Sequence, residues 1–252
     1  MLRLLIKRLL PVGLFLLVMT FPALAQDGSG AGIDFQLSLG EPGEDTDVGV
    51  AIQLVVLMTI LSLAPAIILM MTSFLRIIIV LGFVRNAMGL QSTPPNQALV
   101  GIALFLSFFL MMPVGTRIHE EALQPLEAGE ITSMEALDRA VVPLREFMLR
   151  QTRPGDIDYF MGIAGLPQMT PDELPMRVVI PSFVISELRT AFQMGFLIFL
   201  PFLVVDFIIA TVLMAMGMMM MPPVIVSLPF KVLLFVLADG WYLIVQSLVS
   251  SF

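Results

Sequence analysis

The sequence predicts an all-α fold of long helical hairpins, with four hydrophobic segments and a small helical region inserted between the second and third. Apolar residues make up 58% of the 252 residues and charged residues only 13%, against roughly 45–50% and about 25% in typical soluble domains. Proline- and glycine-containing turns separate the apolar segments. So much apolar surface requires cover by lipid or by partner subunits.

Composition also excludes several classes of protein. The net charge is −7 and gives no basic patch for nucleic acid. No Cys is present, which removes disulfides, thiolate metal sites and a Cys nucleophile. His119 is the single histidine and lies beside two acidic residues, so we interpret it as a solvated histidine. Motifs for metalloproteases, serine hydrolases and phosphate loops are missing from the sequence. We expect no catalytic residue, no metal and no cofactor.

The first residues are typical of a secretory signal. Arg and Lys residues precede a short apolar run at 9–21. Ala23 and Ala25 then form the small-x-small pattern that signal peptidase accepts, with Gln26 as the expected new N-terminus. The alternative is a membrane anchor, but the run is short of the roughly 20 residues that span a bilayer. We expect residues 1–25 to be a cleaved signal peptide.

Residues 26–47 follow as a leader. Six acidic side chains and no Lys or Arg lie in this stretch, together with frequent Gly and Pro. Such a composition cannot bury a core and favours a flexible acidic segment outside the cytoplasm.

The first hydrophobic hairpin is expected at 48–114. Its first apolar segment covers 48–71, and the helix could continue through the apolar residues 74–84. Pro94 and its neighbour Pro95 cannot continue a helix, so they mark a turn. A second segment at 98–114 is marginal in length for a span.

The next part, 115–180, differs in kind. Its stretch 116–177 carries eleven acidic residues and six Arg. Apolar residues recur at helical spacing across 133–150, with Pro143 expected to interrupt or bend that helix. Residues 153–156 read Arg-Pro-Gly-Asp, a turn signal. We expect a small extracytoplasmic helical insert between the two hydrophobic halves.

The second hydrophobic hairpin is expected at 181–252. Its first segment covers 183–221, with a possible bend at Pro201, and its second covers 224–248. The turn at 91–97 adjoins Arg85 and carries no acid, so the positive-inside rule places it in the cytoplasm. The leader, the insert and the last residue would then lie outside.

Charged side chains interrupt the last two apolar segments. A charge at the bilayer centre costs on the order of 2.5–3.5 kcal/mol by insertion scales, so each needs a partner or a wet cavity. We expect the partners on another helix or another subunit, and favour structural pairing, mostly between subunits, over a proton or ion relay. The charges are Glu187, Arg189, Asp206, Lys231 and Asp239.

Methionine is concentrated at one turn. Four consecutive Met residues, Met218, Met219, Met220 and Met221, stand directly before a Pro pair. Methionine is unbranched and adaptable, so a ring of such turns could close a pore and still yield to a passing chain. Ordinary apolar packing is the alternative. From these residues alone, the pore seal and ordinary packing are equally favoured.

Several long motifs stand out along 48–252. They are Met71-Thr-Ser-Phe-Leu-Arg76, Gly82, Arg85-Asn86, Gln91-Ser-Thr-Pro-Pro-Asn96, Phe183-Val-Ile-Ser-Glu187-Leu-Arg189-Thr-Ala-Phe192, Gly195, Pro201, Asp206, Gly217-Met-Met-Met220, Pro222-Pro223, Leu228-Pro-Phe-Lys231 and Asp239-Gly240-Trp241. Together these motifs resemble the FliP family, the export-gate subunits of flagellar type III secretion.

This resemblance implies a place in an assembly. The subunit would be present in about five copies, with FliQ and FliR subunits, in a right-handed helical cone around a channel. Flagellar export substrates would pass through it, in the bacterial inner membrane and periplasm of the basal body. Met218–Met220 would line a seal, which Met221 lengthens. Glu187 and Lys231 match charged positions assigned to subunit contacts, and Arg76 and Asp206 are further candidates for that role.

Three functions are therefore weighed. The first is a gate subunit that conducts unfolded flagellar proteins. A small-solute transporter or ion channel subunit is the second, but the internal repeat that would favour it is not evident. The third is a polytopic membrane enzyme, which the missing motifs disfavour. The methionine run and the charged helices favour the gate.

Overall fold

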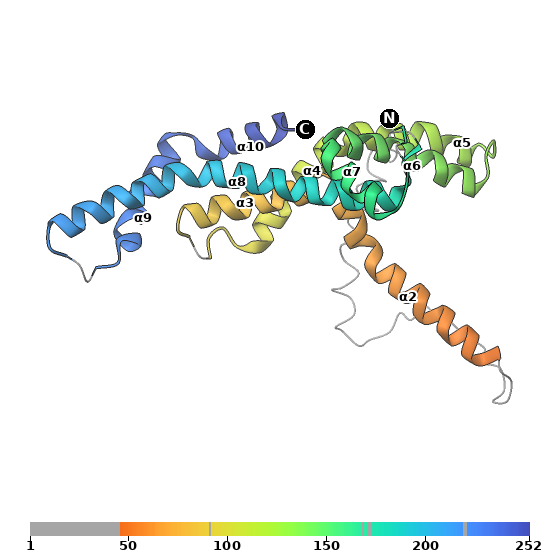
Figure 1. The fold of residues 1–252 in the computed structure, drawn as a ribbon, viewed down its shortest axis with the longest axis horizontal. Helices are drawn as coiled ribbons and strands as arrows, with labels where there is room; N and C mark the ends of the chain where they lie inside the picture. Colours follow the sequence, from red (N-terminus) through yellow and green to blue (C-terminus); the bar gives the residue numbers. More distant parts are fainter. Residues whose placement is uncertain (1–45, 91, 168, 171–172, 219–220) are drawn as a thin grey trace, which may run out of the picture. The chain divides into compact units, whose positions relative to one another are not determined.

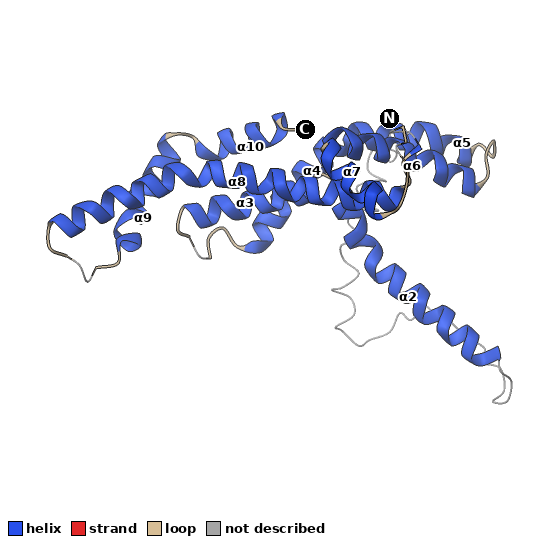
Figure 2. Ribbon diagram, viewed as in Figure 1, coloured by secondary structure: helices blue, strands red, loops and turns tan. Residues whose placement is uncertain are grey.

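A computed structural model describes residues 46–252 except residues 91, 168, 171–172 and 219–220. Over the described residues the regular secondary structure is helical, without strands (Figure 2). The predicted all-α fold class is thereby confirmed. The expected signal-cleavage residues Ala23, Ala25 and Gln26 lie outside the described residues, as does nearly all of the leader.

The helices follow one another along the chain as shown in Figure 1. They are α2 (Thr46–Met70), α3 (Phe74–Ala87), α4 (Asn96–Ile118), the π-helical turn η1 (His119–Leu123), α5 (Gln124–Glu127), α6 (Ser133–Gln151), α7 (Pro154–Ile163), α8 (Met176–Ala215), α9 (Pro223–Leu237) and α10 (Gly240–Ser250).

The first hydrophobic segment forms two helices instead of one. Helix α2 is long and apolar enough to cross a membrane over Ile52–Met70. The expected continuation into 74–84 is wrong, because the chain turns at 71–73 before α3 begins. Thr72 Oγ1 donates to the carbonyl of Leu69 at 2.7 Å and accepts from the amide of Phe74 at 3.3 Å. A hydroxyl that bonds neighbouring backbone groups competes with the helix, which explains the break.

Helix α4 runs beyond the predicted segment 98–114. It continues through η1 and α5, so that Asn96–Glu127 forms one continuous helical stretch of 32 residues. The apolar pattern predicted a helix end where polar residues begin. The structure shows that the helix continues through these polar residues. Arg117 Nε donates to Glu121 Oε1 at 3.0 Å across one turn, an arrangement that stabilises helices.

The predicted helix at 133–150 is confirmed as α6. Thr132 caps it by accepting a hydrogen bond from the amide of Glu135 at 3.3 Å. Pro143 lies inside α6. The expected turn at 153–156 instead opens α7, where Pro154 occupies the first helical position, which suits proline.

The insert shares a hydrophobic core with the flanking helices. Phe147 and Met148 of α6 are buried against Val179 and Phe183 of α8 and Val114 of α4. Figure 1 shows α6 and α7 beside the first half of α8. The boundaries proposed for the insert, 115–180, stay a prediction, while its helices pack directly on α4 and α8.

Helix α8 begins at Met176, earlier than the predicted 183, and ends at Ala215. Pro181 and Pro201 both lie inside it. Gly217 follows with a φ of 74°, a left-handed conformation that favours glycine just after a helix. The predicted segment 183–221 therefore begins too late by seven residues, whereas the helix ends just before the methionine-rich turn, as expected.

The predicted segment 224–248 is a broken pair. Helices α9 and α10 meet at an angle of 63° at Asp239. Asp239 has a φ of 50°, which is uncommon for a residue with a side chain. Three described helices are long and apolar enough to cross a membrane, or up to four if the bent pair counts as one span. The four predicted hydrophobic segments correspond to these elements.

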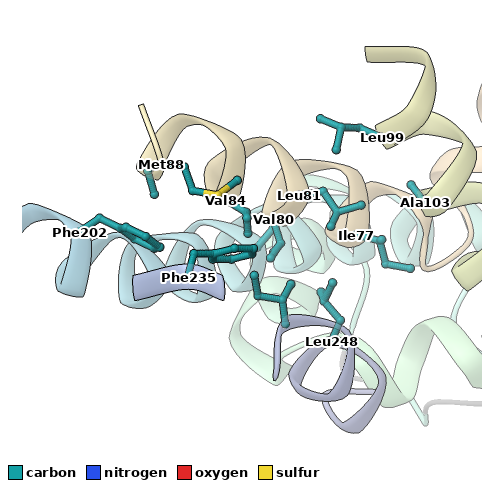
Figure 3. Packing of buried hydrophobic residues seen from close by; sticks show 13 residues of the cluster. Ile77, Val80, Leu81, Val84, Met88, Leu99, Ala103, Phe202, Phe235 and Leu248 are labelled. Carbon is teal, nitrogen blue, oxygen red and sulfur yellow. The ribbon is translucent and has the colours of Figure 1, made fainter. Parts of the chain in front are cut away.

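Helix α3 packs along α8 to form the main core (Figure 1). Figure 3 shows Ile77, Val80 and Val84 of α3 directed toward Phe235 of α9 and Leu248 of α10. Each of the three α3 residues is fully buried. The core therefore joins the first hydrophobic hairpin to the second.

Candidate functional site: buried ion pairs and a methionine-rich turn

Arg76 of α3 and Glu187 of α8 form a fully buried ion pair. Their side chains are 2% and 0% exposed. Arg76 Nε donates to Glu187 Oε2 at 2.8 Å, and Arg76 Nη2 donates to the other carboxylate oxygen. This two-pronged geometry is the strong form of a charge-assisted hydrogen bond. The pair fixes the register of α3 against α8.

The remaining donors of Arg76 are also satisfied. Nη2 donates to Gln151 Oε1 at 3.0 Å. Nη1 donates to the carbonyl of Ser251 at 2.8 Å and to its Oγ at 3.0 Å. All the N–H groups of the guanidinium therefore have acceptors. Since a buried donor without an acceptor costs roughly 1–3 kcal/mol, this complete set lets a cation lie in an apolar core.

The aromatic ring of Phe252 covers the same group. Arg76 Cζ lies 3.9 Å from the centroid of that ring, a cation–π contact. Phe252 also stacks on Phe147 of α6, with centroids 6.4 Å apart. Its carbonyl accepts a hydrogen bond from Gln151 Nε2 at 2.8 Å. Four parts of the chain (α3, α6, α8 and residues 251–252) thus meet at Arg76.

A second ion pair joins α8 to α9. Lys231 Nζ lies 2.5 Å from Asp206 Oδ2, and Ser227 Oγ donates to Asp206 Oδ1 at 2.5 Å. Lys231 is 3% exposed, whereas Asp206 is 28% exposed. The lysine is therefore the group that burial would penalise if its partner were removed. Asp206 retains some access to its surroundings.

Pairing mostly between subunits was expected for these charges, and the structure corrects that expectation. Arg76, Glu187, Asp206 and Lys231 each find an oppositely charged partner within one chain. Two aligned charges that touch inside a low-dielectric core need no further counterion. The role of these residues as subunit contacts stays a prediction, and it no longer follows from unpaired charge.

The other two predicted charges lie at the surface. Arg189 is 52% exposed and lies 3.3 Å from Asp156 Oδ1 at the start of α7. Asp239 is exposed at the break between α9 and α10. On α8, Glu187 and Asp206 are 19 residues apart in sequence, roughly 28 Å along the axis at about 1.5 Å per residue. The two buried pairs are therefore separate sites.

A surface ion pair links α4 to α6. Arg117 Nη1 donates to Glu146 Oε2 at 2.5 Å. That hydrogen bond lowers the pKa of Glu146 below its ordinary value. Both side chains are about 40% exposed or more, so solvent and salt weaken the pair.

The methionine-rich turn connects α8 and α9. Among its described residues Met216, Met218 and Met221 are exposed by 67%, 39% and 44%. Met219 and Met220, two of the predicted seal residues, lie outside the described residues. The described side chains of this turn are available to pack against another surface.

The outer faces of α8 and α9 are apolar and uncovered. Phe207 and Leu237 are 67% and 78% exposed. An apolar groove lies between the two helices, lined by Ile208, Phe230 and Leu234 among others. Exposed apolar area of this extent marks a lipid-facing or subunit-facing surface.

Sequence reasoning missed Gln151, Ser251 and Phe252, which complete the shell around Arg76. Gln151 closes a helix and the other two follow α10, so no spacing pattern marked them. A buried arginine inside an apolar segment is itself a signal that several acceptors must converge on it. Only the three-dimensional arrangement shows which residues supply them.

These features define a class of protein. Three of the described helices are long and apolar enough to cross a membrane, and the buried charges inside the apolar helices are paired with one another. Within the described part of the chain no group of three or more His, Cys, Asp or Glu side chains could hold a metal ion. The length and composition of these helices are those of a polytopic α-helical membrane protein, and the buried charges within its apolar helices pair with one another.

Comparison with known proteins gives the family. The FliP family model matches residues 57–248. Relatives named flagellar biosynthetic protein FliP include one from Bacillus subtilis, 50% identical over 86% of this chain and 98% of its own length. One from Pectobacterium carotovorum is 53% identical, over 80% of this chain and 79% of its own length, and one from Treponema pallidum is 43% identical over 94% and 95%. The chain belongs to the FliP family of flagellar biosynthetic proteins, as the motifs predicted.

Proposed function

We propose that the chain is a core channel-forming subunit of the flagellar type III export gate. In this role it conducts unfolded flagellar proteins across the bacterial inner membrane, together with about five copies of itself and with FliQ and FliR subunits. It would lie in the inner membrane and periplasm of the basal body. Membership of the FliP family supports the assignment to flagellar biosynthesis.

One observation supports the channel role most directly. The charges inside the long apolar helices pair within the chain, while the apolar faces of α8 and α9 remain open. A subunit with this surface can pack against copies of itself without burying unpaired charge. Its open faces are then subunit contacts, with lipid covering the rest.

The exposed methionine turn supports a seal in the channel. Met218 and Met221 stand on either side of Met219 and Met220, which lie outside the described residues, and Pro222 follows Met221 directly. Unbranched thioether side chains adapt to irregular neighbours without a fixed shape. A ring of such turns would block small solutes and still part around an unfolded polypeptide.

A small-solute transporter or ion channel subunit is the alternative function. A relay for ions would need ionisable groups within reach of one another along a path. The separation of the Arg76–Glu187 and Asp206–Lys231 pairs along α8 favours the gate instead.

Deleting Met218–Met220 tests the seal. We expect the assembled complex to leak small solutes, measured as ion conductance in planar bilayers. Met134→Ala on α6 is the control, because Met134 is 72% exposed and lies outside the turn. Unchanged permeability in the deletion, with the complex intact, would exclude the seal.

Replacing Glu187 or Lys231 by Ala tests the subunit contacts. Glu187→Ala leaves the buried Arg76 without its counterion, and Lys231→Ala leaves the partly exposed Asp206 without its counterion. The shape of the α3–α8 or α8–α9 surface should then change, and less oligomer should be recovered in detergent. Exposed Arg139→Ala is the control, since its pair with Glu135 lies at the surface of α6. Normal assembly with lost export would instead indicate a relay.

A further inference from the structure

We propose that residues Ser251 and Phe252 form a latch that locks α10 onto the buried Arg76–Glu187 pair. In doing so they join α6 to the α3–α8 core. The two residues are called the latch below. This arrangement concerns the folded subunit and goes beyond its proposed role in export.

The latch completes the hydrogen bonding of Arg76. Both N–H groups of Arg76 Nη1 point to Ser251, at 2.8 Å to its carbonyl and 3.0 Å to its Oγ. Glu187 and Gln151 already take the donors of Nε and Nη2. Because Arg76 is 2% exposed, the surrounding protein must supply these last acceptors. Without the latch, one nitrogen of a buried cation has no partner.

The latch also joins two separate hydrophobic clusters. Phe252 packs against the cluster around α3, which includes Leu248, and against the cluster around α6, which includes Phe147. Its ring stacks on Phe147, and its carbonyl accepts from Gln151 at 2.8 Å. Phe252, which follows α10, thus bonds to α6 through its carbonyl while its ring lies against Arg76 of α3.

At its other end α10 has no side-chain cap. Asp239 holds a left-handed conformation at φ 50° and makes no capping hydrogen bond to α10, and that conformation is uncommon for a residue with a side chain. Trp241 packs edge-on against Phe235 of α9 at this end. Helix α10 has 11 residues, and only Gly240, Ile244 and Leu248 are buried. A helix this short is marginal by itself, so its position depends on tertiary contacts. The latch supplies these at the end opposite Asp239.

Hydrogen exchange in the full-length protein, with mass-spectrometric readout, tests the latch. Phe252→Ala removes the ring, and Gln151→Met removes the contacts from the α6 side. We expect each change to speed exchange roughly tenfold both in α10 and in the last turn of α6, because the two elements open together. Tyr242→Ala is the control, since Tyr242 is 61% exposed on α10. It should leave exchange in α6 unchanged.

The two-sided design separates a latch from local fraying. If Phe252→Ala speeds exchange only at residues 251–252, or if Gln151→Met leaves α10 unchanged, the latch is wrong. Ser251→Ala removes one acceptor and keeps the backbone carbonyl. Ser251→Ala replaces Phe252→Ala in the test if the Phe252→Ala protein does not accumulate. It should give roughly threefold faster hydrogen exchange in both α10 and the last turn of α6. If Ser251→Ala leaves hydrogen exchange unchanged in both α10 and α6, that result also overturns the proposal.

Discussion

Arg76 shows which contacts allow a charged side chain to be buried in an apolar helix. Its burial is tolerated because Glu187, Gln151 and Ser251 supply acceptors for its N–H groups at donor–acceptor distances of 2.8–3.0 Å. Removing one partner of a buried pair typically costs about 3–5 kcal/mol, whereas replacing both by apolar residues is often neutral. The pair is therefore better evidence for a fixed register than for added stability.

A double-mutant cycle at Arg76 and Glu187 tests this view. Glu187→Met should destabilise the subunit by roughly 3–5 kcal/mol, because a buried cation is left without its carboxylate. The double variant Arg76→Met with Glu187→Met should recover most of that loss. Unfolding in SDS mixtures would measure the free energies. A double variant as unstable as the sum of the single variants would contradict the expectation.

The second pair should respond less strongly. Asp206 is 28% exposed and Lys231 only 3%, so the two partners differ in how much burial penalises them. Lys231→Ala leaves a carboxylate that keeps Ser227 as a donor. We expect a smaller loss of stability for Lys231→Ala than for Asp206→Ala, which strands the buried cation. The same SDS titration would reveal the order, and the reverse order would contradict it.

At the scale of elements, the α3–α8 contact depends on a small residue. A Cβ added at Gly195 of α8 would collide with the ring of Phe83 on α3. Gly195→Ala should therefore destabilise the subunit by roughly 1–3 kcal/mol through overpacking. Gly82→Ala is the matched control, because no atom lies within 4 Å of its added Cβ.

Relief by a second change would establish the cause. Phe83→Ala introduced with Gly195→Ala should restore part of the lost stability, measured again in SDS mixtures. If Gly82→Ala and Gly195→Ala have equal effects, helix propensity and not the ring contact governs this site.

The α4–α6 contact should depend on pH. Arg117 lowers the pKa of Glu146, so the pair stabilises the subunit above the ordinary value of 4.5. That contribution is lost as the pH falls through the depressed pKa. The stability difference between the native chain and Glu146→Gln should thus shrink from pH 7 toward pH 3, in thermal unfolding. Added salt should shrink it too, because both groups are exposed. A difference that persists at pH 3 would contradict the pairing.

The whole molecule shows where sequence reasoning succeeds and where it ends. Apolar runs predicted the helical class and the span-forming segments, since burial in lipid requires such runs. Helix ends were missed where local bonds decide, as at Thr72 and in the polar continuation of α4. The partner of Arg76 could not be found, because Glu187 lies 111 residues away.

The site follows the same rule. Glu187, Lys231, Arg76 and Asp206 were singled out by their cost in an apolar helix, and the structure pairs them. The latch residues carry no charge and no periodic pattern, so they emerge only when distant elements converge. The methionine-rich turn was recognisable from composition. The surfaces that it would contact in an assembly belong to other subunits, so one chain does not contain them.

The central claim is that this subunit builds a channel from copies of itself and two other kinds of subunit. Native mass spectrometry of the complex purified with its partners tests that claim most directly. We predict one dominant species that contains about five copies of this chain with FliQ and FliR subunits. A chain recovered only as a monomer or a dimer, without those partners, would contradict it.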